Sequence, residues 1–497
     1  MNKVPTYVIE VIKTLKNKGF EAYLVGGCVR DLLIDRVPKD WDITTNAKPE
    51  DITSCFEKTV YENNFGTVSV FIPKDDETYE MVEVTPYRLE GKYTDKRHPD
   101  NVSFSDKLED DLSRRDFTIN AIAYSPDIEI PDDISKGQLI DLYKGQEDIK
   151  DKTIRTVGGA KERFSEDALR IVRAIRFSTE LGFTVSQETF DAIIDLSGTI
   201  KDISKERIRD EFTKIIMSDK PEVGIMLLEK TNLLEHIVPE LLEGVDCEQG
   251  GAHKYDVFRH LVEALSHASQ KNWPLDIRLS ALFHDIGKPR TKRQPKGWGR
   301  KPTFYGHEVV GARMANKIME NLKFPKDLTE KVTKMVRYHM FFSDTEKISL
   351  SAVRRIVKNV GVENIWDLMK VRECDRVGMA KTEAPYRLRK YHAMIEEVLR
   401  DPISVKQLKI DGEYMIKELG MNPGPRMGWI LHALLEEVLD DPNKNDIDYL
   451  VKRIEGFEKM NDDELKALGE KAKLQKDILE ENEITRLHQK HSVSNKK

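Results

Sequence analysis

The sequence lacks three features that would place it in a special class of protein. It has no apolar run long enough to cross a bilayer, and its first residues, MNKVPTYVIEVIK, lack the apolar core of a signal peptide. Its four cysteines are scattered through 497 residues without the spacing of a metal site. We therefore expect a cytoplasmic protein without disulfides and without a membrane partner.

An excess of positive charge is also missing. Lys and Arg together number 80 against 87 Asp and Glu, which gives a formal net charge of −7. This balance argues against broad, non-specific nucleic-acid binding, and we expect no DNA partner, although a local basic groove remains compatible with it.

The length of the chain indicates more than one domain, because single hydrophobic cores stop growing at roughly 250 to 300 residues. Residues 1–157 mix strand-like runs such as TVSVFIP with helical stretches, whereas the pattern from about 158 onward is helical. The stretch RFSEDALRIVRAIRFSTELGF has the apolar spacing of a helix that stops at Gly182. The sequence thus predicts an α+β part followed by an all-α part.

The stretch GGCVRDLLIDRVPKDWDITT, residues 26–45, carries a dense set of chemical groups. A short apolar strand leads into the glycine pair that includes Gly27, and a helix-like pattern follows, so backbone N–H groups and Arg30 can meet phosphates there. Asp40 and Asp42 flank one residue, and alternate residues of a strand point to the same side. Two such carboxylates favour Mg²⁺, which takes hard oxygen ligands and substrate phosphates. The alternative for an isolated D-x-D is an acidic turn in solvent.

Several motifs occur in an order and at a spacing that resemble one enzyme family. They are LVGGCVRDLL with KDWDITT, RRDFTINA at 114–121, DLYKGQEDIKDKTIRTV at 141–157, EDALRIVRAIRF at 166–177 and ERIRDE at 206–211. On these motifs the sequence resembles the class II tRNA nucleotidyltransferases, which are CCA-adding enzymes, and the related bacterial poly(A) polymerases. The resemblance implies an α+β N-terminal nucleotidyltransferase head with a palm like that of DNA polymerase beta, followed by an all-α neck, body and tail.

The resemblance also implies one nucleotide site. Asp40 and Asp42 become the catalytic carboxylates, which hold Mg²⁺ for attack of an RNA 3′-hydroxyl on a nucleotide. The residues implied to bind the nucleotide are Gly27, Arg30, Arg115, Asp116, Asp167, Arg170, Arg173 and Arg176. Arg115 suits triphosphate oxygens and Asp116 a ribose hydroxyl, although alone this pair reads as a surface ion pair. Glu83 is a candidate third carboxylate, and a surface-strand glutamate is the alternative.

Asp167 and Arg170 bear on the choice of base. They are three residues apart, so on a helix they share a face. A carboxylate accepts and a guanidinium donates, which complements the pairing edges of cytosine and adenine and leaves unpaired groups against uracil and guanine. The alternative is an i,i+3 surface salt bridge. The polar segment 88–104 resembles the flexible loop of family members that add the final A.

Histidines and aspartates in the second half form another pattern. The ordered set is His260, His284, Asp285, His307, His339 and Asp375. This order resembles the HD phosphohydrolase superfamily, in which imidazoles and carboxylates hold a transition metal that activates water against a phosphoester. The alternatives are structural histidines and a site whose fold has outlived its activity.

We predict a tRNA nucleotidyltransferase that adds C, C and A from CTP and ATP without a nucleic-acid template, and that carries an additional HD phosphohydrolase site. Its partners are tRNA, ATP and CTP, and its cofactors are Mg²⁺ and a transition metal at the HD site. The expected domains are a head at 1–157, a neck with the base-recognition helix at 158–225, a body with the HD domain at 226–395, a tRNA-binding tail at 396–455 and a charged extension at 456–497.

Two rival functions remain open on the sequence. One is a bacterial poly(A) polymerase, which has the same catalytic motifs but tends to be strongly basic, so the acidic balance counts against it. The other is an HD-type metal phosphohydrolase in which the second site is the main activity.

Overall fold

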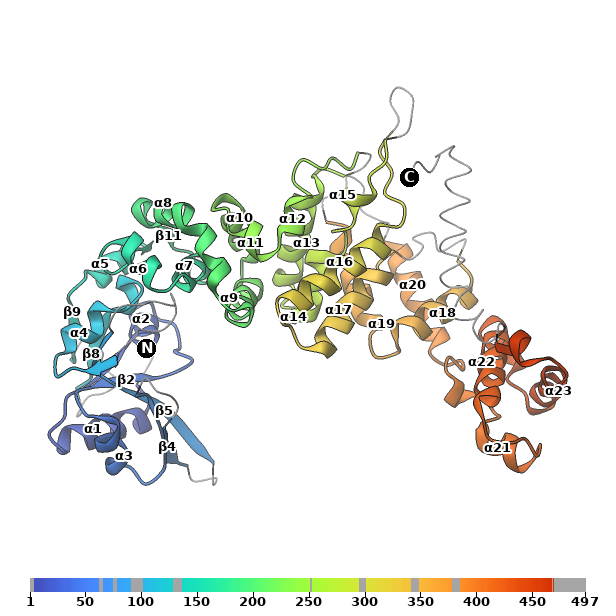
Figure 1. Cartoon of the computed structure of the whole chain (residues 1–497), viewed down its shortest axis with the longest axis horizontal. Coiled ribbons are helices and arrows are strands. Elements are labelled where there is room, and N and C mark those ends of the chain that lie inside the picture. The colour runs from blue at the N-terminus through green and yellow to red at the C-terminus, as the bar shows by residue number, and fades with distance from the viewer. Residues whose placement is uncertain are drawn as a thin grey trace. The chain divides into compact units, whose positions relative to one another are not determined.

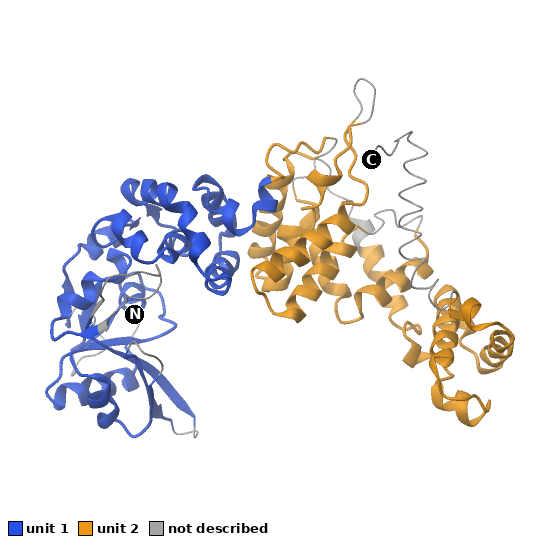
Figure 2. Ribbon diagram, viewed as in Figure 1, with its two compact units in different colours: residues 1–242 blue, residues 243–497 orange. Residues whose placement is uncertain are grey.

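The chain forms two compact units, residues 1–242 and residues 243–497 (Figure 2). The computed structural model describes residues 4–61, 66–74, 78–90, 102–127, 136–250, 253–294, 301–340, 348–377, 385–466 and 468. Most of the loop predicted at 88–104 lies outside these residues. No helix in the described parts is both long and apolar enough to cross a membrane.

A seven-stranded mixed sheet forms the strand-rich part of the first unit (Figure 1). Its order is β3-β4-β5-β2-β1-β8-β9, in which β2 and β5 pair in parallel and the other neighbours are antiparallel. The strands are β1 (Ala22–Val25), β2 (Asp42–Thr45), β3 (Thr59–Tyr61), β4 (Val68–Pro73), β5 (Tyr79–Pro86), β8 (Ile122–Ser125) and β9 (Gln138–Asp141). The short strands β6 (Arg88–Glu90) and β7 (Val102–Phe104) pair separately. This sheet, followed by helices, confirms the predicted fold class.

In the first unit, helices α1 to α4 lie before or between the strands of the sheet, and α5 to α12 follow its last strand, β9. They are α1 (Thr6–Asn17), α2 (Gly27–Leu33), α3 (Pro49–Cys55), α4 (Leu108–Ser113), α5 (Gly145–Lys150), α6 (Ala160–Glu166), α7 (Leu169–Leu181), α8 (Gln187–Leu196), α9 (Lys205–Met217), α10 (Pro221–Lys230), α11 (Leu234–Ile237) and α12 (Pro239–Leu242), with 3₁₀ turns at Thr118–Asn120 and Ser197–Asp202. One exception to the predicted helical pattern is β11 (Thr184–Val185), which pairs in parallel with β10 (Thr153–Ile154).

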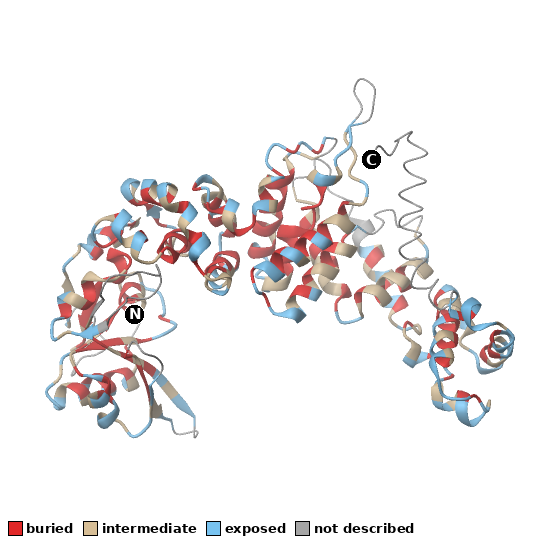
Figure 3. Cartoon of the chain, viewed as in Figure 1, coloured by how far each residue is buried: buried red, intermediate tan, exposed pale blue. Residues whose placement is uncertain are grey.

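Alternation along the strands explains how the sheet is covered. Val82 and Val84 of β5 are buried, whereas Met81, which precedes Val82, is exposed, as the two-residue period of a strand requires. The buried face shares one core with α1 and α3, to which Ile12 and Ile52 contribute. The buried residues, coloured red in Figure 3, therefore lie where the sheet and these helices face one another.

The single helix predicted across RFSEDALRIVRAIRFSTELGF is wrong at Asp167. Helix α6 ends at Glu166, Asp167 has an extended backbone with φ −136° and ψ 106°, and α7 begins at Leu169. The Asp167 carboxylate accepts a hydrogen bond from the Leu169 N–H at 2.9 Å. This i to i+2 bond is a turn interaction that aspartate favours over the helix, so the apolar period continues while the helix breaks.

The second unit is built from helices in its described residues. They are α13 (Val257–Gln270), α14 (Leu275–Phe283), α15 (Lys288–Thr291), α16 (His307–Asn321), α17 (Lys326–Tyr338), α18 (Leu350–Val360), α19 (Ile365–Asp375), α20 (Pro385–Val398), α21 (Gly412–Lys417), α22 (Pro425–Asp440) and α23 (Ile447–Glu458). Helices α13, α14 and α19 meet at the small buried residues Ala264, Ala268, Ala281 and Cys374. Small side chains allow the helices to approach closely, which brings the ends of several helices to one point.

Gly145 allows a close contact between α5 and the turn before β8. A Cβ at this position would lie 2.3 Å from the Thr118 carbonyl oxygen and 2.8 Å from Ile122 Cγ1. We expect Gly145→Ala to lower the free energy of unfolding by about 1–3 kcal/mol, because overpacking forces the backbone to shift. Urea unfolding measures the change. Gly198→Ala, which meets no atom within 4 Å, is the matched control; equal stability of the two variants would contradict the expectation.

Candidate active site and candidate metal centre

A polar cavity of about 410 Å³ in the first unit brings most of the predicted nucleotide-site residues together. Its lining comprises Gly26, Gly27, Cys28, Arg30, Asp31, Arg36, Lys39, Asp40, Asp42, Arg115, Asp116, Asn120, Arg173, Arg176, Phe177, Glu180, Leu181 and Lys214. Asp167 and Arg170 are absent from this lining. The cavity therefore combines the D-x-D with the glycine turn and a ring of cations, but not with the pair predicted to select the base.

The turn between β1 and α2 requires glycine at its first position. Gly26 has φ +82° and ψ −137°, a conformation that side-chain-bearing residues rarely adopt. A Cβ there would also lie 3.1 Å from Arg115 Nη1 and 3.5 Å from Asp42 Oδ2. Backbone, guanidinium and carboxylate thus approach one another around this glycine, as a site for a charged phosphate chain would need.

Asp40 and Asp42 both line the cavity, from a bend and from the first residue of β2 respectively. Trp41 between them is buried, which fixes the alternation that directs its two neighbours away from the core. Burial raises the pKa of Asp42, Arg115 opposes this rise, and the charge of Asp40 adds to it. Glu83 on β5 is paired in register with Asp42. Two neighbouring carboxylates of this kind are suited to share a cation.

A chain of buried hydrogen bonds supports the cavity floor. Asp116 accepts from Arg173 Nε at 2.8 Å and from Asn120 Nδ2 at 3.2 Å. Asn120 in turn accepts from Arg30 Nη1 at 2.8 Å, and Arg30 also donates to Asp31 at 2.7 Å. Burial acts against the charge of Asp116, yet Arg173 and Asn120 bring its pKa down to about 2. The carboxylate is therefore ionised and fixes two arginines of the cavity.

The chain continues onto α9 through Glu211. This buried carboxylate lies 3.2 Å from Arg176 Nε and 4.0 Å from Arg173 Nη1. Arg176 stacks on Phe177, with 3.9 Å between its Cζ and the ring centroid. Arg173 and Arg176 are thus held on one wall of the cavity.

Asp167 and Arg170 lie at the break between α6 and α7 and do not share a helical face. Asp167 Oδ2 accepts from Arg207 Nη2 at 2.8 Å. Arg170 donates to Glu166 at 2.5 Å and to the Arg114 carbonyl oxygen at 3.0 Å. Both groups are therefore paired to other residues. The predicted placement of the two on one helical face is wrong, because Asp167 lies in an extended residue outside α7.

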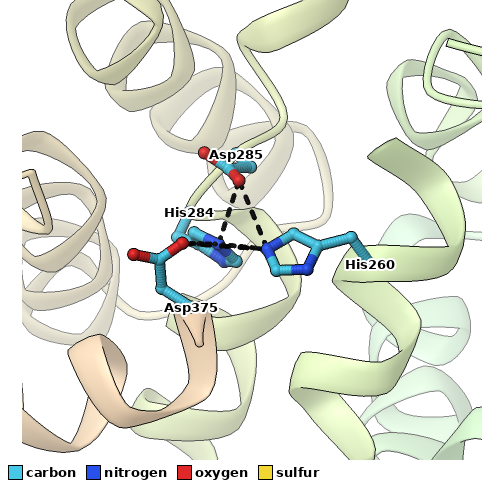
Figure 4. A group of neighbouring side chains, drawn as sticks. All are labelled: His260, His284, Asp285 and Asp375. Carbon is cyan, nitrogen blue, oxygen red and sulfur yellow. Dashed lines mark hydrogen bonds and ion pairs between the residues drawn. The ribbon is translucent and has the colours of Figure 1, made fainter. Parts of the chain in front are cut away.

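The six residues of the HD pattern converge in the second unit, as two groups that share Asp285. Figure 4 shows the first group: His260 and His284 Nε2 lie 3.4 and 3.2 Å from Asp285 Oδ2, and 3.8 and 3.5 Å from Asp375 Oδ1. In the second group His307 and His339 Nε2 lie 3.1 and 3.5 Å from Asp285 Oδ1. The residues come from α13, α16 and α19 and from the ends of α14 and α17, as the resemblance of their order to the HD superfamily predicted.

The hydrogen bonds of the histidines prepare all four rings for a metal. Their Nδ1 atoms face backbone carbonyl oxygens: those of Val377, Ala281, Phe304 and Val336, at 2.7 to 3.1 Å. A carbonyl only accepts, so each Nδ1 donates and each neutral ring keeps the Nε2 lone pair for the centre. Nε2 atoms of opposed rings lie only 3.1 and 3.3 Å apart. Lone pairs at such distances need a proton or a cation between them.

The carboxylates of this centre also require a positive charge nearby. Neither oxygen of Asp285 accepts a hydrogen bond of good geometry, although Lys288 Nζ lies 2.5 Å from Oδ2. Burial by itself lowers the pKa of His284, but Asp285 and Asp375 raise it to about 10. The two carboxylates therefore favour positive charge at this centre, and a metal ion fits the donor set.

Sequence reasoning missed several residues that the structure places at the two sites. Asn120, Lys39 and Lys214 line the cavity, and Asn120 stands in the quoted RRDFTINA motif as a polar residue before an apolar strand. His253 lies edge-on to His260, with 5.8 Å between ring centroids, and burial together with Lys288 lowers its pKa to about 4. Lys214 lies 38 residues after Arg176 in the sequence, and no local pattern predicts its place in the cavity. Only the packing of α9 on α7 brings Lys214 near Arg176.

Three stretches of the chain match known families. Residues 22–155 match the family described as Poly A polymerase head domain. Residues 182–244 match the probable RNA and SrmB-binding site of polymerase A, and residues 257–377 match the HD domain.

Whole proteins with the same organisation are also similar. A CCA-adding enzyme of Lactobacillus helveticus is 32% identical over 468 residues, which cover 92% of this chain and 99% of the relative. A CCA-adding enzyme of Oceanobacillus iheyensis is 42% identical over 257 residues, 52% of this chain and 58% of the relative. The crystal structure of a Bacillus stearothermophilus CCA-adding enzyme in complex with CTP aligns with a TM-score of 0.64 and 27% identity, covering 91% of this chain and 98% of that one.

The low pKa of Asp116 predicts a pH-dependent contribution to stability. Because its folded pKa of about 2 lies below the ordinary value of 3.8, the ionised form stabilises the fold by about 2 kcal/mol. This stabilisation is complete above the unfolded pKa and disappears as the pH falls toward the folded one. Urea unfolding of Asp116→Asn and the parent protein should therefore show a difference at about pH 7 that narrows toward about pH 3. A difference independent of pH would contradict this.

Proposed function

The chain belongs to the family of CCA-adding enzymes and is a nucleotidyltransferase, and on that premise we propose that it adds C, C and A to the 3′ end of tRNA from CTP and ATP. We assign the catalytic role to Asp40 and Asp42. The observation that supports this assignment is the cavity in which both carboxylates face the glycine turn and a set of arginines. The relatives are named for CCA addition, which favours this function over poly(A) synthesis.

The proposed chemistry combines two sets of residues that line the cavity, the carboxylates and the phosphate-binding groups. Asp40 and Asp42 provide hard oxygen ligands that suit Mg²⁺. When bound, the metal lowers the pKa of the attacking 3′-hydroxyl and neutralises charge on the phosphates. Gly27 and Arg30 with Arg115 hold the triphosphate in this scheme, so that pyrophosphate departs toward their N–H groups.

The residue proposed for the sugar, Asp116, lines the same cavity, whereas the residues proposed for the base do not. Asp116 is proposed to accept from the ribose, although its oxygens already accept from Arg173, Asn120 and the Phe117 N–H. We propose that Asp167 and Arg170 read the pairing edge of C and A. Since neither lines the cavity, the base must reach past its wall to the break between α6 and α7.

The remaining assignments follow the family. The Bacillus stearothermophilus relative was crystallised in complex with CTP, which supports CTP as a substrate here, and ATP follows from the product of the reaction. We propose tRNA as the acceptor, recognised through shape and backbone contacts by the helices after α20, and action in the cytoplasm.

Replacing the carboxylates tests the proposed catalytic role. Asp40→Ala and Asp42→Ala should each reduce CTP incorporation by about 10³-fold or more, because metal stabilisation of the transition state is worth several kcal/mol. Single-turnover incorporation on tRNA that ends before CCA measures this. Asp106→Ala, an exposed aspartate outside the cavity, is the control and should incorporate normally. Full activity in either carboxylate variant would refute the assignment.

We also propose that the centre around Asp285 is a metal phosphohydrolase site that acts on a phosphomonoester or a 2′,3′-cyclic phosphate at RNA ends. The four Nδ1-anchored histidines support it, because this hydrogen bonding presents Nε2 lone pairs to a transition metal. A bound transition metal supplies a water of lowered pKa as nucleophile. The chain's own residues hold that ion and exclude bulk water, since five of the six are buried.

Metal content tests the shared role of Asp285. After chelation and reloading with Mn²⁺ or Ni²⁺, Asp285→Ala should lose most bound metal, because both ligand groups depend on it, whereas His307→Gln should lose only part. Elemental analysis of the gel-filtered protein measures this. His267→Gln is the control, since His267 lies on α13 with His260 but pairs with Glu373 at 3.1 Å. Unchanged metal content in Asp285→Ala would rule out the site.

The two proposed activities, nucleotide transfer at Asp40 and Asp42 and hydrolysis at the centre around Asp285, should be separable. Opening of a 2′,3′-cyclic nucleotide by water, which yields the 2′- or 3′-monophosphate, should survive Asp42→Ala in the metal-loaded protein and disappear in Asp285→Ala. CTP incorporation should show the opposite dependence, and a common loss of both activities would contradict two independent sites.

A further inference from the structure

A basic segment leads out of the centre around Asp285, and neither proposed reaction uses it. Between Asp285 and Glu308 the sequence contains no Asp or Glu, whereas seven of its residues are Lys or Arg. The net charge of the whole chain is −7, so this concentration of positive charge runs against the composition of the protein. Clustered charge of one sign raises the local concentration of ligands of the opposite sign.

The described ends of this segment, which joins α15 to α16, form two paired arms (Figure 1). The backbones of Arg293 and Thr303 pair through two hydrogen bonds, both of 2.9 Å. One arm leaves the centre at Lys288, whose Nζ lies 2.5 Å from Asp285 Oδ2. The other arm returns to the centre at His307. Both arms therefore start from residues of the centre itself.

The loop before α13 holds these arms beside the centre. Gln249 accepts a hydrogen bond from Lys288 Nζ at 2.7 Å. A Cβ on Gly250 would lie 3.1 Å from Pro302 Cδ and 3.6 Å from Lys301 Cβ, so the second arm packs on the same loop. Packing as well as chain connection therefore fixes the place of the arms.

Two exposed cations on the arms lack a counter-charge. Neither Arg293 nor Lys301 takes part in an ion pair with another residue that the structure describes. Arg290, by contrast, lies 2.6 Å from Glu243, and Lys288 is close to Asp285. Carboxylates of the protein thus compensate the cations nearest the centre, whereas Arg293 and Lys301 keep their attraction for an anionic ligand.

The distance between these cations and the centre favours a polymer over a mononucleotide. The five residues from Lys288 to Arg293 span at most about 18 Å. A mononucleotide whose phosphate lies at the centre has no second phosphate for the arms, whereas an RNA chain carries one phosphate for each further nucleotide. A terminal 2′,3′-cyclic phosphate also requires a 2′-hydroxyl, which RNA has and DNA lacks.

We propose that Arg293 and Lys301 form a binding surface for single-stranded RNA, which delivers the 3′-terminal phosphate of that RNA to the centre around Asp285. The inference rests on the proposed hydrolytic function of this centre and names its substrate class, an RNA chain rather than a free nucleotide. The arms hold upstream phosphates by charge while the terminal cyclic phosphate lies at the centre. Water then adds at phosphorus, one P–O ester bond breaks, and the released ribose oxygen takes up a proton as a hydroxyl.

The test compares two substrates of the full-length protein loaded with Mn²⁺. One is a short single-stranded RNA that ends in a 2′,3′-cyclic phosphate, and the other is 2′,3′-cyclic CMP. Arg293→Gln/Lys301→Gln should raise KM for the RNA by about 10-fold, because two charged phosphate contacts are lost, and should leave kcat unchanged. Both constants for 2′,3′-cyclic CMP should keep their parent values. An unchanged KM for the RNA would overturn the inference.

Salt dependence gives a second readout, which a folding defect would not mimic. For single strands the logarithm of the binding constant falls with the logarithm of salt by about 0.7 per phosphate contact, so the double substitution should reduce the slope by about 1.4. Lys317→Gln/Lys326→Gln removes the same charge from exposed positions on α16 and α17 and should change neither KM nor slope. Equal effects of the two double variants would show that net charge alone acts, which contradicts the inference.

Crosslinking separates a failure of RNA binding from a failure of hydrolysis. RNA that carries a photoreactive thiouridine near its 3′ end should crosslink to peptides that contain Arg293 or Lys301. If these crosslinks form but no RNA is opened, the arms bind RNA and the proposed hydrolysis is wrong. If RNA is opened and no crosslink maps to the arms, the inference is wrong. Polyglutamate that inhibits as strongly as RNA without a terminal phosphate would also refute RNA as the partner.

Discussion

The nucleotide site depends on the ion pair between the buried Asp116 and the partly exposed Arg173. Asp116 follows α4 in the sheet-bearing part of the first unit, and Arg173 belongs to α7, so the pair fixes the helical wall of the cavity to its floor. Through Asn120 the same carboxylate also orients Arg30 beside the glycine turn. Burial makes an ionised aspartate unfavourable unless it is fully paired, and this demand for pairing sets the positions of the surrounding arginines.

The second unit also holds carboxylates away from solvent, but their neighbours are histidines rather than arginines. The carboxylates of the buried Asp285 and the partly buried Asp375 face histidine Nε2 atoms. The Nδ1 atoms of the same rings lie against backbone carbonyl oxygens. Such a centre is not stable as a set of neutral rings and bare charges, so it calls for a proton or a metal. The first unit uses arginines to compensate buried charge, whereas the second gathers four histidines around its carboxylates.

Much of this organisation could be predicted from the sequence, because it depends on local patterns. The strand, glycine turn and D-x-D were predicted from 20 consecutive residues, and the cavity contains all of their named groups. The HD residues, which are spread over 260–375, were predicted because their order resembles that of the HD superfamily. The error at Asp167 has a definite cause: the apolar period of α7 continues backward through α6, and a single aspartate bond to Leu169 ends the helix without disturbing that period.

Contacts between distant segments could not be predicted in the same way. Lys214 lines the cavity only because α9 packs on α7, and no local pattern marks it. Arg207 and Glu211 stand in the quoted ERIRDE motif, but their contacts with Asp167 and Arg176 depend on the same packing. The partners of Arg170, among them the Arg114 carbonyl oxygen, were equally hidden. Sequence motifs supply the reacting groups, whereas packing supplies the groups that orient them.

The most direct test of the account is nucleotide-resolution extension of a tRNA that ends before CCA, in the presence of Mg²⁺. The account predicts that CTP alone adds two residues, that CTP with ATP completes CCA and stops, and that UTP and GTP add nothing. A long run of A from ATP alone, or extension that continues past CCA, would contradict it.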